Sequence, residues 1–159
     1  LRSGQEVRRA GAPAEQLYEV GTLATIEELQ SPQPGLIQLL CRGDQRFRIV
    51  QSRLLPHRLW VADVEMLVAD LPVSVPEHLA ATTRALEQVL ASLRERDPTS
   101  PAAIAPTSAQ LDDCGWVANR WCELLPLPVA LKQRLMELDN PLVRLELVSD
   151  VLTRTGIMH

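Results

Sequence analysis

Hydrophobic residues follow two different periods along this chain of 159 residues, one in each half. In the first half they alternate with polar residues, a pattern typical of strands that bury one face. In the second half they recur every three or four residues, a pattern typical of amphipathic helices. Because strands come first and helices last, the chain is predicted to be α+β rather than an alternating α/β fold.

Four strand segments are predicted in the first half. A strand over residues 18–29 is followed by a turn rich in Pro and Gly and by an apolar strand over residues 36–41. Gly43 and Asp44 then have the composition of a two-residue hairpin turn, so a separate return strand is expected after them. A last strand over residues 59–68 completes a meander in which each strand buries one face.

Four helices are predicted in the second half. Ser74 and Glu77 match a capping box, which indicates a helix that begins there and runs to about residue 96. A Pro- and Ala-rich linker separates this helix from the rest. The remaining helices are expected over residues 108–124, from Pro128, and from a candidate N-cap at Asn140 to a stop at Gly156.

The change of period divides the chain into two expected lobes. Residues 1–72 form the β lobe and residues 73–159 form a helical lobe of about four helices. Hydrophobic residues make up 46% of the chain, which is enough for a core, and aromatic residues only 3%. Aliphatic side chains are therefore expected to fill that core.

The sequence lacks the motifs of catalysis. It has no P-loop, no H-E-x-x-H, no C-x-x-C and no G-x-S-x-G. The single lysine, Lys132, is expected at the exposed start of a helix, whereas a Ser–Lys dyad needs a buried lysine. His57, His78 and His159 are not at metal-ligand spacing. We therefore expect no enzyme activity, no metal and no cofactor in this chain.

The three cysteines favour a reducing compartment. Cys41, Cys114 and Cys122 cannot all pair with one another. Cys114 and Cys122 are expected on one helix and are separated there by a rise of roughly 12 Å, too far for a disulfide. Reduced, mostly buried thiols and a cytoplasmic location are expected. The sequence also has no apolar stretch long enough to span a membrane.

Trp116 is the one candidate contact residue. The second predicted helix turns Cys114, Val117, Trp121 and Leu125 towards the core, and Trp116 points nearly opposite. An exposed tryptophan on a helix can anchor a partner protein. The favoured alternative is that Trp116 packs against another part of the fold.

Two stretches resemble the amino-terminal substrate-binding domain of the Lon family of ATP-dependent proteases. The first reads LYEVGTLATI over residues 17–26 and GLIQLLCRGDQRFRI over residues 35–49. It is similar to a family strand y-x-V-G-T-x-A-x-I and an apolar strand ending in G-x-x-R-[FA]-x-I. The second reads LLPLPVALKQRLMELDNPLVRL over residues 124–145 and is similar to L-P-L-x-x-x-x-K-Q-x-L-L-E-x-D-x-P-x-x-R-L. The resemblance covers nearly the whole chain from residue 17 onward.

The resemblance implies a PUA-like β pseudo-barrel lobe followed by a helical lobe. It also implies non-catalytic recognition of protein substrates or partners. The expected partners are unfolded or client proteins, together with a protease or a chaperone. Members of the family usually begin with a strand containing Pro-Leu-Phe-Pro, and nothing similar precedes Leu1. The opening strands are therefore expected to be missing, as in a stand-alone Lon-domain protein or an N-terminally truncated fragment.

A PUA-like lobe also leaves an RNA-binding alternative open. The net charge of −4 opposes it, because surfaces that bind nucleic acid are usually basic. Five arginines lie close together in sequence and could nevertheless form a patch: Arg42, Arg46, Arg48, Arg53 and Arg58.

Overall fold

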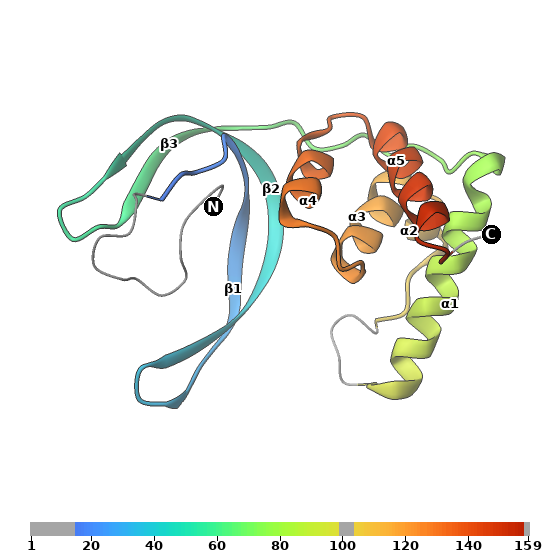
Figure 1. Ribbon diagram of the computed structural model, residues 1–159, viewed down its shortest axis with the longest axis horizontal. Coiled ribbons are helices and arrows are strands. Elements are labelled where there is room, and N and C mark those ends of the chain that lie inside the picture. Colours follow the sequence, from blue (N-terminus) through green and yellow to red (C-terminus); the bar gives the residue numbers. More distant parts are fainter. Residues whose placement is uncertain (1–14, 99–103, 158–159) are drawn as a thin grey trace. The chain divides into compact units, whose positions relative to one another are not determined.

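A computed structural model describes residues 15–98 and 104–157 (Figure 1). Within these ranges the strands precede the helices, so the predicted α+β class is confirmed. The chain forms two compact units that divide between Ala69 and Asp70. The elements are β1 Val20–Gln33, β2 Leu36–Leu54, β3 Trp60–Met66, the 3-10 helix η1 Glu77–Leu79, α1 Ala80–Arg96, α2 Ser108–Leu111, α3 Cys114–Leu124, α4 Val129–Glu137 and α5 Pro141–Arg154.

The first unit is an antiparallel meander with the strand order β1-β2-β3. The β1–β2 hairpin closes at Gly35, whose φ of 83° favours glycine because it has no Cβ. β3 pairs only with the second half of β2, from Phe47 to Leu54. The first half of β2 therefore pairs with β1 alone among the described strands.

The predicted hairpin turn at Gly43 and Asp44 is wrong, because β2 runs through both residues without turning. Thr22 lies opposite Arg46 and Ala24 lies opposite Gly43, so two steps along β1 match three along β2. The extra residue on β2 makes a bulge. A Gly-containing pair inside a strand is compatible with a bulge or a turn, and the long pairing with β1 selects the bulge.

The expectation that each strand buries one face is also wrong for the described residues. Val20 is the only residue of β1, β2 and β3 that is buried. The described residues of this unit form one layer, and nothing in the same layer can cover a sheet face. Its aliphatic side chains consequently remain largely exposed.

The second unit has the hydrophobic core that the helical periodicity predicts. Leu86 and Leu90 of α1 pack with Val117 and Trp121 of α3. The indole Nε1 of Trp121 donates a hydrogen bond to the carbonyl of Thr82 at 3.1 Å, so its polar atom is satisfied inside the core. The remaining buried members of the cluster are Leu79, Cys114, Ala118, Leu125, Leu135, Leu145, Val148 and Leu152.

Two predicted helix starts differ from the structure. Ser74 does not cap a helix. It forms an isolated bridge with Asp113, and α1 begins after the 3-10 turn of η1 without a side-chain cap. The single helix expected over residues 108–124 is two helices, because Asp113 adopts an extended conformation and caps α3 by accepting a hydrogen bond from the Gly115 N–H.

The predicted ends of the last helix are confirmed. The Asn140 side chain accepts hydrogen bonds from the N–H groups of Leu142 and Val143, and Pro141 occupies the first turn. At the other end Gly156 has a φ of 71°, and the Ile157 N–H donates to the Leu152 carbonyl at 3.0 Å. This is the hydrogen-bond pattern of a Schellman motif.

Candidate functional site

The β1–β2 hairpin carries an exposed aliphatic surface on one side. Residues directly opposite on antiparallel strands share a face, and here Ile26 lies opposite Cys41 and Leu29 opposite Leu39. Ile37 shares the face of Leu39 because side chains alternate along a strand. The exposed fractions are 55% for Ile26, 61% for Leu29, 64% for Ile37 and 52% for Leu39. We call these four residues the hairpin face.

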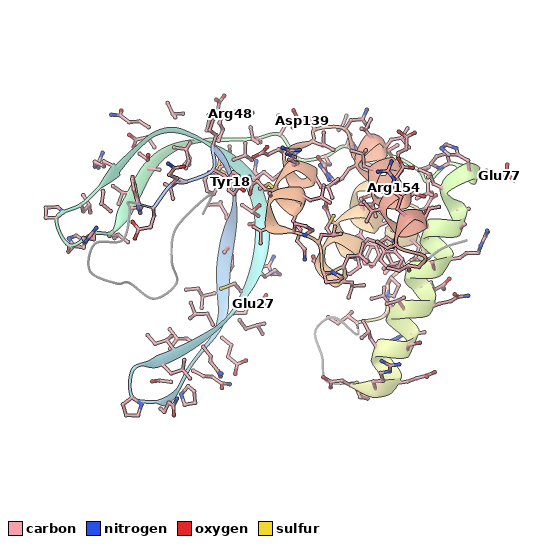
Figure 2. The ribbon with its side chains drawn as sticks, in the orientation of Figure 1. Tyr18, Glu27, Arg48, Glu77, Asp139 and Arg154 are labelled. Carbon is pink, nitrogen blue, oxygen red and sulfur yellow. The ribbon has the colours of Figure 1, made fainter. Side chains whose placement is uncertain are left out.

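A bulge in β1 brings the hairpin face into register. Ile26 and Leu29 are three residues apart, so a regular strand would place them on opposite faces. The pairing shifts between Ile26 and Glu28, because β1 has one extra residue there. The extra residue returns the Leu29 side chain to the face of the sheet that carries Ile26. The extra residue is Glu27, whose carboxylate accepts a hydrogen bond from Arg42 Nε at 2.8 Å (Glu27 is labelled in Figure 2).

The other face of the same hairpin is mainly polar. Glu28 lies opposite Leu40, and Gln30 lies opposite Gln38. The Gln30 amide donates a hydrogen bond to the Glu28 carboxylate, so these two side chains pair with each other on this face. Because one side is aliphatic and the other carries polar residues beside Leu36 and Leu40, the hairpin is amphipathic. A contiguous exposed apolar surface of this kind marks an interaction site in soluble proteins.

An open strand edge adjoins the hairpin face. In the part of the chain that the structure describes, the stretch of β2 from residue 36 to residue 44 pairs with β1 on one side, and no strand pairs with its other side (Figure 1). The unpaired backbone N–H and C=O groups of such an edge can accept a further strand. The hairpin thus offers both apolar side chains and main-chain hydrogen bonds to an extended polypeptide.

Trp116 lies on α3, where the predicted inner face is confirmed: Cys114, Val117, Trp121 and Leu125 are all buried. Trp116 itself is half-buried and packs against the helical core. The guanidinium of Arg120 lies over its ring at 5.4 Å from the centroid and also pairs with Glu123 at 2.6 Å. The role of Trp116 as a partner contact stays a prediction.

Sequence reasoning missed Arg144, which is buried to 2% exposure in α5. Its side chain donates to the Asp70 carboxylate at 2.6 Å, to the Leu135 carbonyl at 3.0 Å and to Asn119 Oδ1 at 3.2 Å. It also donates to the Leu138 carbonyl. A single guanidinium therefore ties α3, α5, the end of α4 and the chain at Asp70 together.

A signal for Arg144 was present in the sequence. It lies three residues after Pro141 and directly before Leu145, on the buried stripe of α5. A charged residue at a stripe position is a buried ion in need of partners. The same residue matches the arginine of the second motif that resembles the Lon family.

Two of the five arginines lie beside carboxylates in the structure. Arg42 is paired with Glu27, and Arg48 lies opposite Glu65 in the β2–β3 register. Arg58 sits in the turn before β3 with a φ of 67°. Two of the five arginines thus have a carboxylate as an ion-pair partner or cross-strand neighbour, and the RNA-binding alternative gains no support from this arrangement.

The helical unit also has a shallow groove of about 360 Å³. It lies along α1 and is lined by Ala85, Gln88, Val89, Ser92, Leu93, Arg96 and Ile157.

Lys132, expected to be solvated, is half-buried on α4. Within residues 15–98 and 104–157 no group of three or more His, Cys, Asp or Glu side chains could hold a metal. No described helix is long and apolar enough to cross a membrane.

The thiols differ more in burial than expected. Cys114 is buried and Cys122 half-buried, but Cys41 is exposed, so the expectation of mostly buried thiols is wrong for Cys41. Burial raises the pKa of Cys114, and the nearby Asp113 carboxylate raises it further. Burial also raises the pKa of Cys122, although the positive charges of Arg144 and Lys132 oppose the shift.

We therefore predict that one thiol reacts much faster than the others in the native protein. A thiol reagent at neutral pH should modify Cys41 rapidly, because only the thiolate reacts and access is needed. Cys114 should react only after unfolding, and Cys41→Ser should abolish the fast phase. Equal rates for all three thiols in the folded protein would contradict these burial states.

Comparisons with known proteins agree with the fold. The model of the family described as "ATP-dependent protease La (LON) substrate-binding domain" matches residues 3–154. A "Lon protease 2" of Herpetosiphon aurantiacus is 29% identical over 144 residues, which are 87% of this chain and 17% of the relative. A "Lon protease 2" of Desulfotalea psychrophila is 28% identical over 139 residues, which are 87% of this chain and 18% of the relative. The chain thus spans less than a fifth of the length of these relatives.

Two solved structures are similar to this chain. A Lon N-terminal domain protein from Xanthomonas campestris has a TM-score of 0.59 and 28% identity, and the match covers 90% of this chain and 71% of that one. The N-terminal domain of the Mycobacterium avium complex Lon protease has a TM-score of 0.57 and 21% identity, with 87% and 72% covered. The second likeness shows the fold alone.

Proposed function

We propose that this chain, which belongs to the family of LON substrate-binding domains, binds exposed apolar segments of client polypeptides on the hairpin face. The match to the family model confirms the family resemblance inferred from the two sequence motifs. The substrate-binding domain is the non-catalytic part of a Lon protease, and protein recognition is its general role. The observation that supports the proposed site is the amphipathic β1–β2 hairpin with its exposed aliphatic side.

The energetics of the hairpin face suit a receptor for many sequences. Burying a Leu or Ile side chain completely contributes about 1.5–3 kcal/mol, and these side chains are already about half covered, so each contributes roughly 1 kcal/mol. Association and ordering of the client offset much of the sum. Binding therefore requires several contacts together, with hydrogen bonds to the open edge of β2 independent of the client's sequence.

The finer features of this function are also proposals. We propose that the clients are unfolded or partly unfolded proteins, because a folded protein seldom exposes a run of apolar side chains. A protease or a chaperone would act on the clients that this domain holds. The exposed thiol of Cys41 suits the reducing conditions of the cytoplasm. Trp116 is proposed as a secondary contact on the helical unit.

A peptide array tests this function directly. Overlapping peptides from unrelated proteins are probed with the purified chain, whose fold is checked by circular dichroism. We expect capture of peptides rich in aliphatic and aromatic residues, and little capture of charged peptides of the same length. If the folded chain captures no peptide, or captures apolar and charged peptides equally, the proposal is wrong. A salt-sensitive shift of single-stranded RNA would favour the nucleic-acid alternative instead.

A further inference from the structure

The segment that leaves the β unit is held firmly to β2 as far as Leu67. The Leu67 N–H donates to the Arg46 carbonyl at 2.9 Å. The Leu67 carbonyl in turn accepts a hydrogen bond from Gln45 Nε2 at 2.8 Å. Both backbone groups of Leu67 are thus bound to the neighbouring strand, so this residue moves with the β unit.

The same segment is fixed again from Asp70 onward, this time to the helical unit. The Asp70 carboxylate is bound by the buried guanidinium of Arg144. Further along, the Val73 carbonyl accepts from the Cys114 N–H at 2.8 Å, and the Val75 N–H donates to the Asp112 carbonyl at 3.1 Å. Residues 70–75 therefore move with the helices.

Gly115 at the start of α3 lies beside the Asp70 carboxylate. A Cβ at position 115 would lie 3.5 Å from Asp70 Oδ2 and 3.4 Å from the Cβ of Pro141, which are ordinary van der Waals distances. The start of α3 is therefore packed against both Asp70 and α5. The anchor is thus formed by the packed helical unit.

Val68 and Ala69 are the two residues between these anchors. Both are exposed, Val68 to 83%. In the described part of the chain neither makes a backbone hydrogen bond, whereas Leu67 is bound through its backbone and Asp70 through its carboxylate. Hinges are short segments whose φ and ψ angles absorb a change of orientation while both sides stay rigid.

We propose that Val68 and Ala69 form a two-residue hinge between the β unit and the helical unit, with the Arg144–Asp70 ion pair fixing its helical end. Breaking the ion pair would extend the mobile segment to the next anchor at Val73, from two residues to five. The spread of end-to-end distances grows with the square root of the number of residues, so it should increase about 1.5-fold. The hinge does not depend on the proposed client binding.

Electron paramagnetic resonance distance measurements test the hinge. One spin label is placed on the exposed Cys41 and another on an introduced cysteine in α1, Glu87→Cys, in a Cys122→Ser background. Asp70→Asn should broaden the distance distribution about 1.5-fold. Ala69→Gly should broaden it as well, because glycine enlarges the accessible φ and ψ range at the hinge.

Leu71→Gly is the matched control for the hinge. Leu71 is exposed like Ala69, but it lies inside the anchored segment, so the width of the distribution should not change. The proposal is wrong if Leu71→Gly broadens the distribution as much as Ala69→Gly. It is also wrong if Asp70→Asn leaves the width unchanged while the helical unit stays folded. Should Asp70→Asn unfold that unit, the two glycine variants decide the question.

Discussion

Replacing Arg144 by methionine is expected to lower the free energy of unfolding of the helical unit by about 3–5 kcal/mol. The substitution leaves the Asp70 carboxylate, only 20% exposed, without its cation. It also removes the donor to the carbonyls of Leu135 and Leu138, which lie where α4 ends. Breaking a buried pair by removing one partner costs more than the pair contributes, because the other charge stays buried.

Urea unfolding followed by circular dichroism at a helical wavelength measures this effect. Arg134→Met is the control, since Arg134 is an exposed arginine on α4 and its substitution should change the stability by less than about 0.5 kcal/mol. Combining Arg144→Met with Asp70→Leu should recover part of the loss, because no charge is then left unpaired. A loss below about 1 kcal/mol for Arg144→Met alone would show that the guanidinium does not hold the unit together.

The double substitution Ile37→Asp with Leu39→Asp is expected to weaken the binding of apolar peptides by about 2–3 kcal/mol. That loss corresponds to a rise in Kd of about 30–150-fold. The substitution removes two aliphatic side chains from the hairpin face and puts two carboxylates there, which a bound client would have to desolvate. Both positions are more than half exposed in the free protein, so the fold itself should tolerate the change.

The matched control for this variant lies on the same strand. Gln38→Asp with Leu40→Asp adds two carboxylates to the opposite face of β2, at positions interleaved with the first pair. Fluorescence anisotropy with a labelled apolar peptide should give a Kd within about threefold of the wild type for this control. Similar losses for both pairs would mean that net charge, and not the hairpin face, governs the binding.

The helical unit could be predicted largely from local signals. The aliphatic stripe of α1, the cap at Asn140 and the stop at Gly156 are all confirmed, because helix ends and buried faces are set by residues a few positions apart. The break at Asp113 was missed. An aspartate can either continue the first turn of a helix or cap a new one, and the contact of Ser74 with Asp113 decides for the cap.

The features that sequence reasoning missed depend on contacts between distant residues. Asp70 and Arg144 are 74 positions apart, so no local pattern pairs them. The bulge at Gly43 is selected by the strand opposite it, and the same dipeptide in a shorter hairpin would make a turn. Alternating aliphatic residues look identical in sequence whether their face is covered or exposed. The hairpin face therefore becomes visible only in the structure.

The candidate site illustrates the same limit. Resemblance to the Lon family led to the correct family and the general role, but it pointed to no binding residue. Trp116 was selected from a helical wheel, which places a residue on one helix and ignores its neighbours. In the structure Trp116 is half-buried against the core and stacked by Arg120. The strands that carry the hairpin face were instead each expected to bury one face.

Photo-cross-linking locates the surface of the chain that holds a bound peptide. An apolar peptide that the chain captures is synthesised with a photoreactive phenylalanine at its centre, irradiated in complex with the wild-type chain, and the adducts are located by mass spectrometry. We expect adducts on the β1–β2 hairpin, at or beside Ile26, Leu29, Ile37 and Leu39. Adducts confined to the helical unit, along the groove of α1 or at Trp116, would contradict this expectation.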